Sequence, residues 1–201
     1  KNKIGFLALE YSGHGKSYGK FEDGNITSWT NDTKKIIRKK INNKKLIVVG
    51  SSMGGWIALN ILKVFKKNIL AFVGIAPAPE FLDRLMWNKF TNKVKKQLIK
   101  DKFHKFNHGG YEYNISYNLI KDGRRNKIFN KNYTNKIFIT ILHGQKDEVV
   151  PISISRKILK IFKKAKKKLI IIKFGDHSLS NKRNLKRITN EIGSIYKRLR
   201  P

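Results

Sequence analysis

The sequence has no cysteine, only 4 prolines and no long apolar run. Without cysteine the chain cannot form disulfides, thiolate metal sites or a cysteine nucleophile, and we expect a reducing compartment, taken to be the cytoplasm. The longest apolar stretch, residues 68–79, is shorter than the roughly 20 residues that a membrane-spanning helix needs, and it contains Gly74. The sequence therefore predicts no transmembrane segment.

Acidic residues are also scarce, since 13 Asp and Glu face 45 Lys and Arg and leave a net charge of +32. Such a surplus would bind nucleic acid or anionic membranes nonspecifically at low salt. However, the lysines are spread through every helix-like segment and accompany many Asn and Ile residues, so a bias towards A/T-rich codons explains them without a partner. Because no zinc-finger, RNP-like or basic-zipper pattern is present, we predict no specific nucleic-acid partner and keep a basic binder as an alternative.

The length of 201 residues and the 40% hydrophobic content fit one globular domain, residues 1–201. Apolar runs alternate with amphipathic segments, which predicts a mostly parallel sheet with helices on both faces. Expected strands lie at residues 4–11, 45–49, 69–75, 136–142 and 169–174, and expected helices at 28–41, 56–65, 154–164 and 184–196. Residues from about 77 to 135 lack a clear buried strand and are predicted to form a small helical cap inserted over one end of the sheet.

The motif Gly50-Ser51-Ser52-Met53-Gly54 follows one expected strand and precedes a helix. In the pattern G-x-S-x-G the glycines allow an abrupt turn that holds the central serine exposed above the sheet. Ser52 is that serine, because taking Ser51 instead would place Val49 and Met53 in the glycine positions. We therefore predict that Ser52 is a nucleophile.

A serine nucleophile needs a base, and the base needs an orienting carboxylate, in the chain order Ser, Asp or Glu, His. Asp147 follows an expected strand and His177 follows the last one, so we predict that Asp147 is the acid and His177 the base. Singly, Asp147 also fits a residue at a helix N-terminus and His177 an ordinary loop histidine, but the order and positions agree. Asp176 and Glu148 are weaker candidates for the acid.

The remaining histidines and the first glycine-rich loop receive simpler interpretations. We expect His143 to be structural, His104 and His108 to be surface residues, and His14 to pack in its loop or line the site mouth. The run from Gly13 to Ser17 resembles the end of a phosphate-binding loop, but the required earlier glycine is Glu10, and no helix is expected to follow.

Several segments together resemble the α/β-hydrolase superfamily, and within it the group that contains the mitochondrial palmitoyl-protein thioesterase, also described as an acyl-glucuronide esterase, and its bacterial relatives. They are Glu10 to Ser17, Trp29, Asp32, Val49 to Trp56, Leu142 to Pro151, Asp176-His177 and, in the cap, Gly110 to Tyr117, Leu119-Ile120 and Asp122 to Arg124.

This resemblance implies the α/β-hydrolase fold and hydrolysis of an ester or thioester, on a small molecule or an acyl-protein, through an acyl-serine intermediate without a metal or organic cofactor. It also implies that the backbone N–H of Met53 binds the oxyanion. A general carboxylesterase and a peptidase stay open as variants. The apolar cap residues would line an acyl site or simply pack on the sheet; they are Phe81, Leu85, Trp87 and Phe90.

Family members carry, before the segment that matches residues 4–11, a strand and a loop that supplies the second oxyanion donor. The sequence starts at Lys1 without Met, and no such segment precedes Ile4. We therefore expect missing N-terminal strands, an open sheet edge and a loss of roughly 10²–10³ in rate. The alternative to a serine hydrolase is a noncatalytic scaffold or a truncated, inactive fragment.

Overall fold

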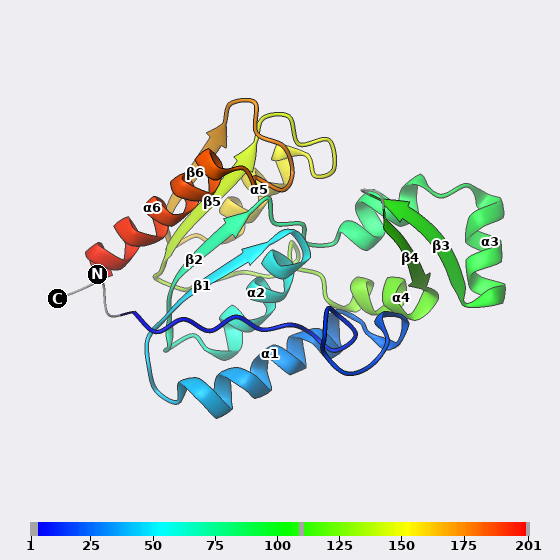
Figure 1. The fold of residues 1–201 in the computed structure, drawn as a ribbon, viewed down its shortest axis with the longest axis horizontal. Helices are drawn as coiled ribbons and strands as arrows, with labels where there is room; N and C mark the ends of the chain where they lie inside the picture. The colour runs from blue at the N-terminus through cyan, green and yellow to red at the C-terminus, as the bar shows by residue number, and fades with distance from the viewer. Residues whose placement is uncertain (1–3, 109–110, 200–201) are drawn as a thin grey trace.

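The computed structural model describes residues 4–108 and 111–199. Its centre is a sheet in which every neighbouring pair of strands is parallel, in the order β1-β2-β5-β6 (Figure 1). The four strands are β1 (Leu46–Ser51), β2 (Ile69–Ile75), β5 (Phe138–Gly144) and β6 (Lys166–Ile172). Because parallel strands need crossover connections, helices follow them and cover both faces of the sheet, as the sequence predicted.

The alternation of side chains along β2 shows how the two faces are filled. Phe72 points into the core shared with α2 (Ser52–Val64) and α5 (Ile152–Ile161), and α1 (Ile26–Ile41) packs on α2. Ala71 and Val73 point to the opposite face, which α6 (Lys182–Leu199) covers (Figure 1). Nowhere in the described residues does a helix combine the length and apolarity needed to cross a membrane.

The chain between β2 and β5 forms the cap beside the sheet (Figure 1). Its elements are η2 (Leu82–Met86), η3 (Trp87–Lys89), α3 (Asn92–Asp101), β3 (Phe103–His108), β4 (Tyr111–Ser116) and α4 (Tyr117–Arg125). The antiparallel pair β3-β4 was not predicted. Its signal in the sequence is Gly109-Gly110 between two runs of mixed aromatic and polar residues, the pattern of a hairpin.

Two buried carboxylates organise the cap, one within it and one across to α1. Glu80 Oε1 accepts hydrogen bonds from the backbone N–H groups of Ile128 (2.8 Å) and Phe129 (2.9 Å). Asp122 accepts from the backbone N–H (2.8 Å) and hydroxyl (2.7 Å) of Thr27 in α1. The Glu80 bonds therefore join the two ends of the cap segment, and the Asp122 bonds attach the cap to α1.

The strand predicted over residues 4–11 is absent, which corrects the sequence interpretation. Within the described residues no other strand lies alongside this segment to form a ladder, and Phe6 is 91% exposed. An apolar run becomes a strand only when a neighbour pairs with its backbone. The segment is fixed at its end instead, where Ser12 bonds to Asp32 Oδ2 and its carbonyl accepts from Trp29 Nε1.

Candidate active site

The turn from β1 into α2 presents Ser52 at a constrained backbone position. Ser52 has φ +48°, in the left-handed region that non-glycine residues rarely adopt. A Cβ on Gly50 would lie 2.5 Å from the carbonyl oxygen of Gly54, and one on Gly55 would lie 2.5 Å from Cβ of Pro77. The absence of side chains at these positions therefore allows the strand and helix to approach closely enough to form this turn.

The contact at Gly50 leads to a stability prediction. Gly50→Ala is expected to lower the free energy of unfolding by about 1–3 kcal/mol, because the added methyl group meets backbone and not a flexible side chain. Gly193→Ala in α6 is the matched control: a Cβ there meets nothing within 4 Å, so the variant should gain about 0.5–1 kcal/mol. Urea unfolding measures both changes. Equal stability of the two variants would contradict the conclusion that the close backbone contact at Gly50 excludes a side chain.

The loops that follow β5 and β6 are joined by backbone hydrogen bonds. The N–H of Gln145 donates to the carbonyl of Ile172 (2.9 Å), and the N–H of Lys146 donates to that of Gly175 (2.8 Å). A Cβ on Gly144 would overlap the carbonyl oxygens of Gly175 and Asp176. The two loops are therefore held side by side at the carboxyl ends of neighbouring parallel strands.

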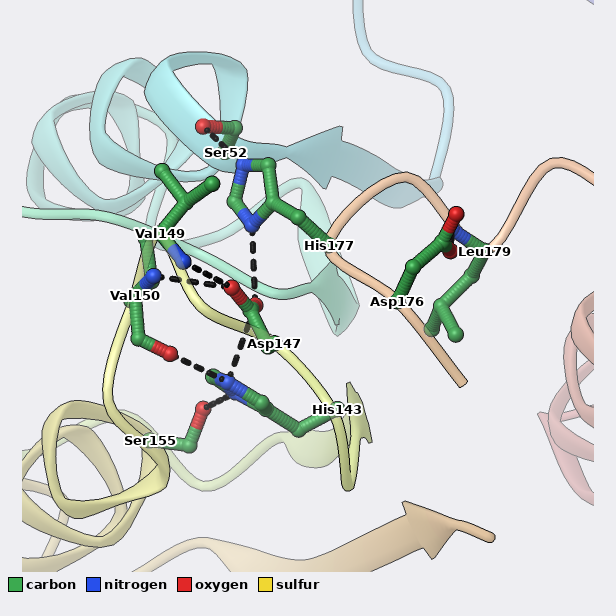
Figure 2. A network of polar contacts seen from close by, with 9 residues as sticks. All are labelled: Ser52, His143, Asp147, Val149, Val150, Ser155, Asp176, His177 and Leu179. Carbon is green, nitrogen blue, oxygen red and sulfur yellow. Dashed lines mark hydrogen bonds and ion pairs between the residues drawn. The ribbon is translucent and has the colours of Figure 1, made fainter. Parts of the chain in front are cut away.

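These turns bring together the three residues singled out in the sequence. His177 Nε2 lies 3.0 Å from Ser52 Oγ, and His177 Nδ1 lies 2.8 Å from Asp147 Oδ2 (Figure 2). The imidazole sits between the hydroxyl and the carboxylate, and the three side chains come from the ends of three different strands. Both distances are those of good hydrogen bonds.

The Asp147 carboxylate is fully buried and surrounded by donors. Its Oδ1 accepts from the backbone N–H groups of Val149 (2.9 Å) and Val150 (2.8 Å). Burial acts to raise the pKa of Asp147, but hydrogen bonds from His143, His177 and the Val150 N–H outweigh it and hold the pKa well below its usual range. Asp147 is therefore ionised.

The ionised carboxylate sets the tautomer of His177. Because Asp147 Oδ2 can only accept, the neutral imidazole carries its proton on Nδ1 and leaves Nε2 free to accept from Ser52 Oγ. A hydroxyl that donates to a free imidazole nitrogen is the arrangement that activates a serine.

Asp176, the alternative acid, points elsewhere. Its Oδ1 accepts from the backbone N–H of Leu179 (2.8 Å), and its side chain turns away from His177 (Figure 2). This geometry favours Asp147 as the acid.

The other histidines lie in different surroundings. His14 packs edge-on against Tyr11 and Trp29 in its loop, and His104 packs edge-on against Phe90 in the cap. His143 is buried, and the sequence interpretation did not connect it with Asp147. The side chain of His108 lies outside the described residues.

The first glycine-rich loop folds back on Glu10. The N–H of Lys16 donates to Glu10 Oε2 (3.2 Å), and Ser17 Oγ donates to the Glu10 carbonyl (3.3 Å). A short 3-10 turn, η1 (Phe21–Asp23), follows in place of the helix that a phosphate-binding loop opens. The backbone N–H of Lys16 in this loop therefore bonds to the Glu10 carboxylate of the same chain segment.

The four apolar cap residues named from the sequence are partly buried and pack against the main core. Phe81 lies edge-on to Trp56 with ring centroids 5.9 Å apart, and the Arg124 guanidinium lies 4.6 Å from the ring of Trp87. All four thus have packing contacts, including Leu85 and Phe90.

Comparison with known proteins places the chain in a family. Residues 1–107, just over half of the sequence, match the model of the family described as serine aminopeptidase, S33. The chain belongs to this family. The S33-family chain is 26% identical over 197 residues to the human mitochondrial palmitoyl-protein thioesterase ABHD10, covering 96% of the chain and 63% of that protein. It is 30% identical over 149 residues to the rat protein, covering 73% of the chain and 50% of the relative.

Solved structures show the same fold. A protein from Agrobacterium vitis S4 superimposes with a TM-score of 0.87 at 29% identity, covering 92% of the S33-family chain and 74% of the other. Mouse alpha/beta hydrolase domain-containing protein 10 gives 0.84 at 24% identity, with coverage of 95% and 77%. The predicted α/β-hydrolase fold is confirmed, and so is the resemblance to the group that contains the ABHD10 proteins. The curated relatives are named as mitochondrial proteins, whereas a cytoplasmic location for this chain stays a prediction.

Proposed function

We propose that this S33-family chain is a serine hydrolase that cleaves a carboxylic ester or thioester through an acyl intermediate on Ser52. The observation that carries the proposal is the continuous hydrogen-bond chain from Ser52 Oγ through His177 to the buried Asp147. The names of the ABHD10 relatives, which describe a palmitoyl-protein thioesterase, support this class of reaction.

In the first half of the proposed reaction, His177 Nε2 takes the Ser52 proton while Ser52 Oγ forms a bond to the acyl carbon. Asp147 stabilises the resulting imidazolium. The carbonyl electrons move onto oxygen, and the N–H of Met53 donates to this oxyanion, since N–H groups in the first turn of α2 lack intrahelical acceptors. As the tetrahedral intermediate collapses, His177 returns the proton to the departing oxygen or sulfur.

The second half repeats these steps with water. His177 removes a proton from the water, whose oxygen bonds to the acyl carbon, and the acyl–Oγ bond then breaks. The proton on His177 passes to Ser52 Oγ, which restores the free enzyme and releases the carboxylic acid. Every proton thus enters and leaves through Nε2 of His177, the atom that faces Ser52.

Covalent labelling with a fluorophosphonate, read by intact mass, tests the nucleophile. We expect one label on the wild-type protein, none on Ser52→Ala, and normal labelling of Ser51→Ala. Ser51 is the matched control because it is exposed and its side chain makes no cap hydrogen bond at the start of α2. A folded wild-type protein that takes no label would favour the noncatalytic scaffold.

The labelled fraction also gives the number of active sites for a substrate series. Acyl thioesters and p-nitrophenyl esters of increasing acyl length, compared with an aminoacyl anilide, separate a thioesterase, a general carboxylesterase and an aminopeptidase. We expect the thioesters and esters to be cleaved faster than the anilide, because an amide has the poorer leaving group.

A further inference from the structure

A second imidazole, that of His143, lies against Asp147 and has no role in the proposed reaction. His143 is fully buried, and its Nε2 lies 3.1 Å from Asp147 Oδ2 and 2.8 Å from the carbonyl oxygen of Val150. Its Nδ1 lies 2.7 Å from Oγ of Ser155, a buried residue of α5 (Figure 2). Both ring nitrogens of His143 therefore have partners.

These partners determine the tautomer of His143. Nε2 faces two oxygens that can only accept, so it carries the ring proton. In the neutral ring Nδ1 is then an acceptor, and the Ser155 hydroxyl donates to it. Ser155 thus orients His143 for Asp147, as Asp147 orients His177 for Ser52.

We propose that His143, held by Ser155, is a positioning residue for Asp147, an inference that rests on the proposed hydrolase function. Asp147 Oδ2 accepts from His177 and lies 3.1 Å from His143 Nε2, which shares its proton with the Val150 carbonyl oxygen, while Oδ1 accepts from the N–H groups of Val149 and Val150. Rotation of the carboxylate would break hydrogen bonds at both oxygens. The carboxylate therefore stays aligned with Nδ1 of His177.

His143 supplies a contact that does not depend on the reaction. The Asp147–His177 contact changes strength during turnover, because His177 alternates between imidazole and imidazolium. His143 instead makes its contact from a site with no solvent exposure, where its ring nitrogens face Asp147, Val150 and Ser155 and not the reacting Ser52. Without His143, Oδ2 would be held through side-chain contacts by His177 alone among the described partners.

The test measures the rate of p-nitrophenyl ester hydrolysis in His143→Leu and His143→Gln. Each rate is divided by the number of active sites, which a parallel fluorophosphonate labelling of Ser52 counts, and this gives kcat per site. Loss of the donor in His143→Leu is expected to lower this value by about 10- to 100-fold, since small misplacements of catalytic groups have effects of this size. His143→Gln, whose amide nitrogen can reach the Nε2 position, is expected to restore most of the rate. A purely structural role would lower the number of labelled sites and the melting temperature while leaving the rate per site unchanged.

Ser155→Ala tests the other end of the network while retaining the imidazole. We expect kcat per labelled site to fall by about 3- to 10-fold, because Nδ1 loses its donor. Ser153→Ala is the matched control on the same helix, since Ser153 is exposed, and it should match the wild type. Unchanged rates per site in both His143→Leu and Ser155→Ala would overturn the inference alone, whereas absence of label on the wild-type protein would overturn the proposed function itself.

Discussion

The His177→Ala variant is expected to hydrolyse a p-nitrophenyl ester with a kcat about 10⁶-fold below that of the wild-type protein. In the wild-type protein the His177 imidazole lies within hydrogen-bond reach of Ser52 Oγ, at 3.0 Å, and can take the serine proton and return it to the leaving group. A neutral hydroxyl is a weak nucleophile, so the attack itself is lost. Steady-state kinetics on folded protein, checked by thermal melting, measure the effect.

A double variant shows whether Ser52 and His177 act as one unit. Ser52→Ala/His177→Ala is expected to be no slower than either single variant, because removing one member already abolishes the shared step. Multiplicative losses in the double variant would mean that the two residues act independently, and the proposed proton transfer between them would be wrong.

Asp147→Asn is expected to lower kcat by about 10⁴-fold while the fold is retained. The amide oxygen will take the Oδ1 position, where two backbone N–H groups donate. The amide NH₂ then occupies the Oδ2 position and faces Nδ1 of His177 and Nε2 of His143. As a donor it forces His177 to carry its proton on Nε2, and such an imidazole cannot accept the proton of Ser52.

Asp176→Asn is the matched control for this substitution. The Asp176 side chain accepts one hydrogen bond, from Leu179 N–H, and an amide oxygen can accept it equally well. Its kcat should therefore equal that of the wild type. Loss of activity in Asp176→Asn with full activity in Asp147→Asn would reassign the acid.

The buried strands could be predicted because an unbroken run of apolar side chains by itself indicates a strand that is covered on both faces. Residues 69–75 are apolar throughout and form β2 with those bounds. The last strand was predicted from residue 169, whereas β6 begins at Lys166. The three added lysines are exposed, and their backbone pairs with residues 138–140 of β5, a contact that depends on the neighbouring strand. The hairpin in the cap was missed although Gly109-Gly110 gave a local signal, because its strands are not apolar throughout.

The positions of Ser52, Asp147 and His177 were predictable because a parallel sheet brings the carboxyl ends of its strands to one edge. The contact of His143 was not, although it lies only four residues before Asp147. It depends on how the turn after β5 folds and on where α5 places Ser155, and neither is encoded in a local pattern.

The lysines at the start of β6 also affect how copies of the protein meet one another. Among the described strands β6 is an outer one, and an outer strand exposes backbone groups to which a strand of another molecule can add. A second copy that added to this strand would approach the exposed Lys166 and Lys167 while each copy carries a net charge of +32, and such like charges repel. The large positive charge thus disfavours self-association at this edge, and added salt weakens that protection.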